Sequence, residues 1–433
     1  MRLRERLRSV YFNTGDLTES QCRNNQKRLI VSSTVANVLL ALTTGSFLAG
    51  FLSHLGASAQ YCAVLGAIPQ LGCIMQMLSP YIFERMKNRK LLICVCCFIF
   101  RFSLSTIVFV PLLVSSVTLR LALIMVIEIV AYLAAGFVTP GWNYWNLSIA
   151  PEKNRGRFLA VKDIISMLVV ALISLGVGGM LDHYREKGAV MAGFTIMFSA
   201  ATVLSVVDFL VASGIREPKV HTNDVQPTFR QIILKPLQDK PFRLFIVFLS
   251  IWSFAIQFSV SFIPVYMVTG LKFNFSFISA VTMAGNLFGM VAVYLWGSLA
   301  DRTSWSFLMK VSGSIIALCY TGWFFVNGGN AKFLVPVLQV LLACCNGAFS
   351  MASMNLQFKI SPPAGKTSYL GMASAISCVI SFGGALLGSF IYSALENVQF
   401  WIGNMQIGNI QILFFSTSIL LIISLLFKQK HGI

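Results

Sequence analysis

Charged residues are scarce in this chain of 433 residues: Asp, Glu, Lys and Arg make up 11% of it, whereas 56% is hydrophobic. The mean hydropathy is +0.77. Such a chain has too little polar surface to cover a soluble globule. The net charge of +18 is spread over short segments between apolar runs, which excludes a basic nucleic-acid-binding domain. We therefore expect an integral membrane protein with lipids as partners and no nucleic-acid partner.

Histidine is also scarce, and no metal-ligand pattern is present. The four histidines, His54, His183, His221 and His431, all fall outside the apolar runs. Nine of the ten cysteines lie inside apolar runs, and none has zinc-site spacing with a histidine nearby. The sequence therefore predicts no histidine proton relay, no metal site and no cofactor, and buried cysteine is expected to act as a small apolar residue.

Uncharged stretches of membrane length divide the chain. Between Arg28 and Glu84 there is no Asp, Glu, Lys or Arg, and this length accommodates two helices of about 20 residues joined at His54 to Ser58. The same rule predicts four more helices in the first half, from Lys90 to near Pro111, from Arg120 past Pro140, from Lys162 to Asp182 and over 190–215. Six further helices are expected over 244–269, 274–299, 305–326, 333–356, 368–394 and 406–427.

The middle of the chain interrupts this pattern. Residues 216–243 contain no membrane-length apolar run but carry prolines and six Lys or Arg, which is typical of a linker. The sequence therefore predicts two six-helix bundles, over 29–215 and 244–427, joined by a cytoplasmic linker over 216–243. A cytoplasmic N-terminal segment, 1–28, precedes the first bundle, and a cytoplasmic tail, 428–433, follows the second.

Lys and Arg are distributed unevenly between the two sides of the predicted bundles. Segments on the side of the termini hold 27 of the 33, the opposite side holds five, and Arg101 lies within the third helix. Cytoplasmic loops carry an excess of Lys and Arg. We therefore expect a multi-pass protein of the cell membrane with both termini in the cytoplasm.

Two loops repeat at half-chain spacing. The first repeat relates Gly297-Ser298-Leu299-Ala300-Asp301-Arg302 to a degraded copy around Glu84 and Arg85, 217 residues earlier. The second relates Pro362, Lys366 and Tyr369 to Pro151, Arg155 and Phe158, 211 residues earlier. Two separate loops with similar offsets predict a duplicated six-helix half.

The glycine, three residues, Asp-Arg pattern of residues 297–302 resembles the loop motif of the major facilitator superfamily of secondary transporters. The resemblance implies an all-α integral membrane fold with twelve transmembrane helices in two pseudo-symmetric six-helix bundles. It also implies a bacterial permease of unassigned specificity that works by alternating access. The conformational or gating loop residues by resemblance are Gly297, Asp301, Arg302, Glu84 and Arg85. Asp301 is expected at the start of helix 11 when the cytoplasmic side is closed, where the helix dipole favours an anion.

In that family, helices 1, 4, 7 and 10 line the central cavity, with 2, 5, 8 and 11 beside them. The resemblance makes these residues candidates for substrate binding: Asn37, Gln70, Glu128, Trp252, Gln257, Asn286, Gln339 and Asn346. For one amide alone, a hydrogen bond between helices is the better interpretation. As a set with only one charge they favour a neutral or weakly charged organic solute, and we expect the mid-depth amides to converge with Trp252 near the rim.

Arg101 and Glu128 are expected near mid-membrane on consecutive antiparallel helices, so the sequence predicts an intramembrane ion pair between them. Two interpretations stay open. Glu128 is a proton carrier or substrate contact tuned by Arg101, or the pair only locks helices 3 and 4 together, which is favoured because Arg101 holds Glu128 ionised. Asp208 is placed at the cytoplasmic interface.

The predicted function is secondary active or facilitative transport of a small neutral or weakly charged organic solute by a monomer. A proton or sodium ion is a possible coupling partner. Drug or metabolite efflux by proton antiport is an alternative, although Ser174 and Leu175 replace the glycine-proline step expected before Gly178-Gly179 in family antiporters. A non-transporting membrane receptor or sensor is the alternative from another class. An enzyme is not expected, because no His, Asp or Glu cluster lies at a membrane surface.

Overall fold

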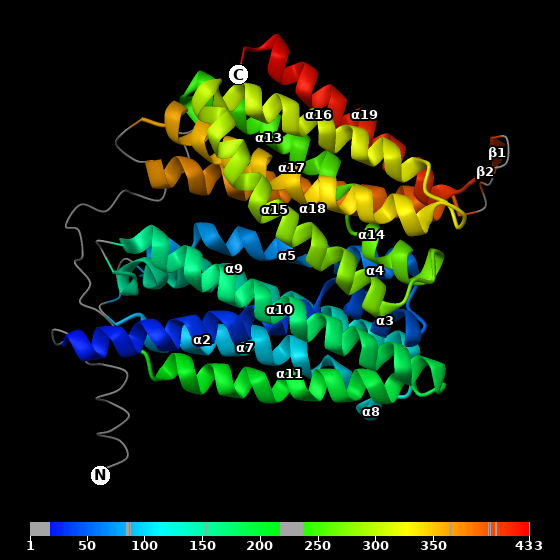
Figure 1. Ribbon diagram of the computed structural model, residues 1–433, viewed down its shortest axis with the longest axis horizontal. Helices are drawn as coiled ribbons and strands as arrows, with labels where there is room; N and C mark the ends of the chain where they lie inside the picture. The colour runs from blue at the N-terminus through cyan, green and yellow to red at the C-terminus, as the bar shows by residue number, and fades with distance from the viewer. Residues whose placement is uncertain are drawn as a thin grey trace. The chain divides into compact units, whose positions relative to one another are not determined.

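A computed structural model describes residues 18–83, 86, 88–151, 154–216, 237–362, 366–396, 398, 400–402 and 405–432. This part of the chain is almost entirely helical (Figure 1). Twelve helical stretches within it are long and apolar enough to cross a membrane. The predicted number of membrane helices and the all-α class are therefore confirmed. The chain divides into two compact units, residues 1–56 with 71–226 and residues 57–70 with 227–433.

The first unit contains the helices of the N-terminal half. Its elements are α2 (Glu19–Thr43), α3 (Gly45–His54), η1 (Cys73–Met77), α6 (Ser79–Phe83), α7 (Lys90–Thr106), η2 (Ile107–Phe109), α8 (Val110–Leu113), α9 (Val117–Ile149), α10 (Arg155–Glu186) and α11 (Val190–Ser213), with α5 (Ile68–Gly72) at the boundary between the units. Helix α7 packs against both α9 and α11, and α2 packs against α10 and α11.

A short break separates α2 from α3 within the first membrane span. Gly45 has φ +61°, a left-handed conformation that suits glycine. Just before it, the Thr43 and Thr44 hydroxyls donate to the carbonyls of Leu39 and Leu40 at 2.8 and 2.6 Å. These bonds to the preceding turn end α2 without leaving polar groups unpaired in an apolar setting.

The second unit holds α4 (Ala59–Leu65) and the helices of the C-terminal half. These are α13 (Lys240–Gln257), α14 (Phe262–Val265), the π-helix η4 (Tyr266–Gly270), α15 (Phe275–Arg302), α16 (Trp305–Phe324), α17 (Ala331–Ile360), α18 (Lys366–Ala394) and α19 (Asn409–Lys430). Residues 57–70, which the sequence pattern places in the first bundle, group with this unit. Helix α4 packs on α18, and the Ser389 hydroxyl donates to the Gln60 carbonyl at 3.4 Å.

A small hairpin precedes the last helix and departs from the predicted pattern. Strand β1 (Phe400–Ile402) pairs antiparallel with β2 (Met405–Ile407), with Phe400 opposite Ile407. The expected helix from 406 therefore begins at Asn409. A short apolar run does not distinguish a strand from the start of a helix. At the start of α19 the Gly408 amide donates to the Gln411 side chain at 3.1 Å, and this bond caps the helix.

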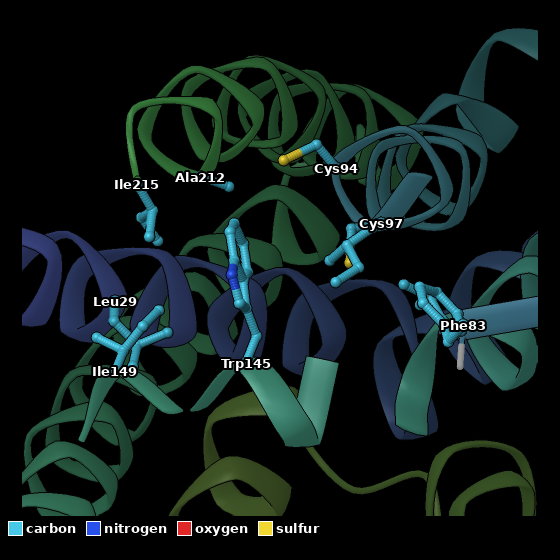
Figure 2. Packing of buried hydrophobic residues seen from close by; sticks show 10 residues of the cluster. Leu29, Phe83, Cys94, Cys97, Trp145, Ile149, Ala212 and Ile215 are labelled. Carbon is cyan, nitrogen blue, oxygen red and sulfur yellow. The ribbon is translucent and has the colours of Figure 1, made fainter. Parts of the chain in front are cut away.

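Large apolar side chains fill the interior of the first unit. Figure 2 shows Trp145 in the middle of a buried cluster drawn from α2, α7, α9, the segment 212–215 and α6. The members are Leu29, Phe83, Ile93, Cys94, Cys97, Val138, Trp145, Ile149, Ala212 and Ile215. This cluster fixes α7, α9 and α11 against one another and thereby sets the directions of the polar side chains that they carry.

Glycines allow the closest helix crossings in both units. A Cβ added to Gly72 would collide with the Tyr132 carbonyl of α9, and one added to Gly388 of α18 would collide with the Phe258 carbonyl. Small residues at such crossings let backbones approach closely, which stabilises helix pairs where lipid removes the hydrophobic driving force.

Candidate functional site

A cavity of about 470 Å³ lies within the second unit, between α13, α17 and α18. Its lining is formed by Leu249, Trp252, Ser253, Asn346, Phe349, Ser350, Ser353, Met354, Gln357, Ala373, Ser374 and Ser377. None of these lining residues is ionisable. Seven of the twelve carry a hydroxyl or an amide group, so the cavity offers many hydrogen-bonding groups beside its apolar side chains, and concave sites with oriented polar groups are typical of small-molecule binding.

Two stacked aromatic rings form one wall of this cavity. The Trp252 and Phe349 ring centroids are 4.0 Å apart with 13° between the ring planes, and both residues are buried. On its far edge Trp252 packs against α16, where a Cβ on Gly313 would lie 3.2 Å from the indole Cη2. The two rings are therefore packed against each other and against α16, and they supply apolar surface to the lining of the cavity.

A polar stripe on α17 faces the same cavity. Asn346, Ser350, Ser353 and Gln357 follow one another at spacings of four, three and four, which places them on one face of a helix. Within this stripe the Gln357 amide donates to the Ser353 hydroxyl at 3.2 Å. Amides and hydroxyls both donate and accept, so the stripe can bind hydroxyl, carbonyl or amide groups of a neutral solute.

Serines of α18 complete the lining opposite the stripe. Ser374 and Ser377 lie one turn apart on this helix. In the part of the chain that the structure describes, the buried Ser377 hydroxyl has no hydrogen-bond partner. A buried hydroxyl without a partner costs about 1–3 kcal/mol. A shift that opens this hydroxyl to the cavity would let it bond to a solute or water and remove that cost.

The cavity brings together two of the eight predicted substrate-binding residues, Trp252 and Asn346. Three others make bonds elsewhere. The Asn37 amide donates to the Ser166 hydroxyl of α10 at 2.8 Å, Gln257 donates to Ser261 at 3.0 Å, and Gln339 contacts the Met267 sulfur at 3.8 Å. Gln70 on α5, Asn286 on α15 and Glu128 on α9 do not line this cavity.

Several cavity residues were not among the predicted substrate-binding residues, although the sequence contains a pattern that indicates them. Ser350, Ser353 and Gln357 continue from Asn346 at helical spacing, so a search for polar stripes would have found them. A search for single amides selected only Asn346. The serines of α18 have no comparable signal, because serine is common inside membrane helices as a bonding partner of its own backbone.

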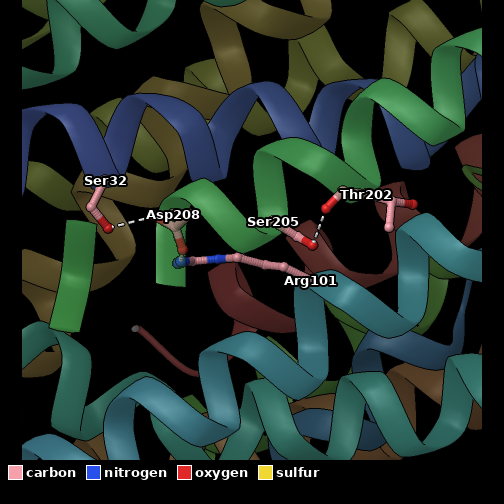
Figure 3. A network of polar contacts seen from close by, with 5 residues as sticks. All are labelled: Ser32, Arg101, Thr202, Ser205 and Asp208. Carbon is pink, nitrogen blue, oxygen red and sulfur yellow. Dashed lines mark hydrogen bonds and ion pairs between the residues drawn. The ribbon is translucent and has the colours of Figure 1, made fainter. Parts of the chain in front are cut away.

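The predicted ion pair of Arg101 with Glu128 is wrong, because Arg101 instead pairs with Asp208 of α11. Figure 3 shows Ser32 of α2 and Arg101 of α7 both directed at this carboxylate. The Ser32 hydroxyl donates to Asp208 Oδ1 at 2.6 Å, and an Arg101 Nη1 hydrogen bond reaches Oδ2. Asp208 is 1% exposed and Arg101 is 7% exposed, so the network is buried within the first unit.

Side-chain direction explains the different partner. In a helix each Cβ tilts toward the N-terminus, so Arg101 extends toward the Lys90 end of α7, where α11 ends at Ser213. The guanidinium lies 5.4 Å from the centroid of Trp142 on α9. Trp142 is 14 residues beyond Glu128, or about 21 Å along the helix axis. Glu128 extends toward the opposite end of α9, and the two charges diverge.

Glu128 is left without an ionic partner among the described residues. It is 1% exposed, and its Oε1 atom has no hydrogen-bond partner there. Buried ionisable groups inside membrane helices are costly and mark functional positions by default.

The loop motif lies at the end of α15. Asp301 and Arg302 are exposed, and Gly297 lies near α17, where an added Cβ would be 3.9 Å from the Met351 methyl group. The other half of the predicted gating pair, Glu84 and Arg85, lies outside the described residues. The docking of Asp301 at the start of α18 stays a prediction.

Comparisons with known proteins agree on one family. A sequence model described as Major Facilitator Superfamily matches residues 30–385. Solved structures with the same fold include the nucleoside transporter NupG, with TM-score 0.69, 13% identity and coverage of 95% of this chain and 100% of that one. A bacterial homologue of the iron transporter ferroportin gives TM-score 0.71, 12% identity and coverage of 94% and 98%. A D-xylose-proton symporter gives TM-score 0.66 and 13% identity, with coverage of 94% of this chain and 97% of that one. No curated protein shows significant sequence similarity to the chain.

Proposed function

Because the chain belongs to the major facilitator superfamily, whose members are membrane transporters and not enzymes, we propose that it carries a small neutral organic solute by alternating access. The solute binds in the cavity of the second unit. Rocking of the two six-helix halves then exposes this cavity to one side of the membrane and the other in turn. We further propose that both termini are cytoplasmic and that the membrane is the cell membrane, as the bias in Lys and Arg indicates.

The observation that carries this proposal is the chemistry of the cavity. Its lining residues offer hydroxyl and amide groups and a stacked aromatic wall without any ionisable side chain. A solute with a full charge would lose its hydration there without a countercharge, which is costly at low dielectric. A neutral solute that carries hydroxyl or amide groups regains its hydrogen bonds from α17 and α18 and stacks an apolar face on Trp252 and Phe349.

The shared fold does not select the solute by itself. Solved structures of the same fold include transporters of nucleosides and of xylose, and a bacterial homologue of the iron transporter ferroportin. The first two solutes are neutral rings bearing hydroxyl groups, and they are therefore useful first probes for this cavity.

Counterflow into proteoliposomes tests the proposal. Vesicles preloaded with unlabelled uridine or D-xylose are diluted into the labelled compound, with choline and benzoate as cationic and anionic comparisons. We expect counterflow of at least one neutral solute and of neither ion. Asn346→Leu is expected to abolish most of this activity, because Leu keeps the branched shape of Asn but cannot form its hydrogen bonds.

A matched control is available on the same helix. The Asn355 side chain donates to the Met351 carbonyl of its own helix at 2.9 Å and does not line the cavity. Asn355→Leu should therefore leave counterflow near the wild-type rate. Transport of an ion but of no neutral solute would contradict the proposal. Thermal stabilisation by a neutral solute without counterflow would instead favour the receptor alternative.

A further inference from the structure

Glu128 lies on the buried stripe of α9 rather than at a helix end. It is 1% exposed, and its neighbours on the stripe, Ile124 and Ala131, are both 0% exposed. No described residue forms a hydrogen bond with its Oε1 atom. An unpaired carboxylate in such surroundings costs several kcal/mol. These surroundings therefore favour the neutral acid over the carboxylate.

The charged groups on elements packed against α9 are directed elsewhere. On α7, Lys90 lies at the first residue, and Arg101 is bound to Asp208. The charged residues of α2 are confined to its first ten positions: Glu19, Arg23, Lys27 and Arg28. On α9 itself Arg120 lies eight residues away, about 12 Å along the axis, and donates to the Val114 carbonyl at 2.6 Å.

The other titratable residues on these elements are cysteines and tyrosines. Those on the packed elements are Cys22 of α2, Cys73 of η1, Tyr81 of α6, Cys94, Cys96 and Cys97 of α7, and Tyr132 and Tyr144 of α9. Helix α8 carries none. Tyr132, one turn along α9 from Glu128, packs on Phe100 of α7 with ring centroids 5.3 Å apart.

The contact between Phe100 and Tyr132 shows which part of α7 lies beside Glu128. Because α7 and α9 are antiparallel, Glu128 comes level with α7 beyond Phe100, toward Leu104. Residues 102–113 contain no ionisable side chain. The carboxyl group therefore has no countercharge on this side that would keep it ionised.

Resting on the proposed transport function, we propose that Glu128 carries a coupling proton. In a conformation that opens it to water on one side, the carboxylate takes a proton from hydronium, and an O–H bond forms. The neutral acid is then enclosed as in the present structure. After access changes, the O–H bond breaks and the proton passes to water on the other side. Water supplies and accepts the proton, so the step needs no other reactant.

In this scheme the solute and the proton bind to different residues. Glu128 belongs to the first unit, and the cavity residues belong to the second. A substitution at Glu128 is therefore expected to remove coupling to the proton gradient while it leaves solute binding intact, which separates it from substitutions at Asn346.

Infrared difference spectroscopy of the purified full chain tests the proton on Glu128 without any solute. The wild-type spectrum minus the spectrum of Glu128→Gln, both recorded at neutral pH, should show the C=O stretch of a protonated carboxylic acid, which the variant lacks. Asp163→Asn is the matched control, because Asp163 is exposed at the start of α10; it should leave that band in place. Identical carboxylic-acid bands in wild type and Glu128→Gln would overturn the proposal.

Transport with uridine or D-xylose in proteoliposomes supplies the second test. For one proton per solute, a pH difference of one unit should drive about tenfold accumulation in the wild type. Glu128→Gln should keep counterflow and lose this accumulation, so that the concentration ratio falls to about one. Glu128→Asp keeps a carboxyl group and should retain part of the accumulation. This variant provides the test if Glu128→Gln does not fold.

The two tests separate the proposals. Accumulation by Glu128→Gln at the wild-type ratio would overturn the role of Glu128 and leave the transport function standing. Absence of counterflow for every neutral solute would instead defeat the proposed function, and the infrared band would still decide whether Glu128 holds a proton.

Discussion

The buried network around Asp208 makes a graded prediction about stability. Asp208→Asn removes one charge of the ion pair and leaves the Arg101 guanidinium unpaired beneath Trp142. Removal of one partner of a buried pair costs roughly 3–5 kcal/mol, mostly because the other charge stays desolvated. Loss of the Ser32 hydrogen bond to the same carboxylate, in Ser32→Ala, should cost only about 1.5 kcal/mol.

These magnitudes convert into measurable melting shifts. For a unit of roughly 200 residues, 1 kcal/mol corresponds to about 2–4 °C, so a loss of about 3 kcal/mol for Asp208→Asn predicts a fall of about 6–12 °C. The double variant Arg101→Met with Asp208→Leu removes both charges and should recover much of this loss. Thermal unfolding of the detergent-purified chain measures all of these variants. If the double variant is as unstable as the sum of the single ones, the desolvation argument is refuted.

Three further predictions concern the cavity and the helix crossings. Asn346→Leu should lower solute counterflow roughly tenfold by the loss of an orienting hydrogen bond, and Asn355→Leu should not; equal losses would remove Asn346 from the site. Trp252→Ala should weaken solute binding, measured as loss of ligand-induced thermal stabilisation, because the aromatic wall disappears; unchanged stabilisation would exclude the wall from the site. Gly388→Ala should destabilise the chain because its Cβ meets the Phe258 carbonyl, whereas Gly383, with nothing within 4 Å, should accept Ala in the same melting assay; equal melting temperatures would contradict this packing account.

The helices themselves were predictable from the sequence, because the lipid interior allows few alternatives. Every backbone polar group must be bonded within the segment, so an uncharged run such as that between Arg28 and Glu84 has to become helix. The turn at Gly56, with φ +87°, falls inside the predicted junction. The hairpin before Asn409 lay beyond this rule, because apolar residues outside a membrane span carry no such restriction.

The partner of Arg101 was not predictable from depth alone. Counting residues from the helix ends placed Arg101 and Glu128 at similar levels, but the Cβ tilt sends their side chains in opposite directions. Asp208 lies five residues before Ser213, so the same count places it near the end of α11 and not level with Arg101. The reach of the Arg101 side chain toward that end of α7 spans the difference in level, and α2 closes the network with Ser32.

The candidate site was predictable only in part, for a related reason. Trp252 and Asn346 stood out as single polar or aromatic residues in apolar helices, and both line the cavity. Gln257 and Gln339 stood out equally but bond to Ser261 and Met267. A sequence shows which residues can form hydrogen bonds, whereas the choice between a neighbouring helix and a solute depends on helix rotation.

We propose above that a neutral solute binds in the cavity of the second unit. Cryo-electron microscopy of the chain with a saturating concentration of the neutral solute that shows counterflow tests it most directly. We predict density for one solute molecule against the Trp252 and Phe349 rings, within hydrogen-bonding distance of Asn346. Solute density outside this cavity, or beside a charged side chain such as Arg101, would contradict the account.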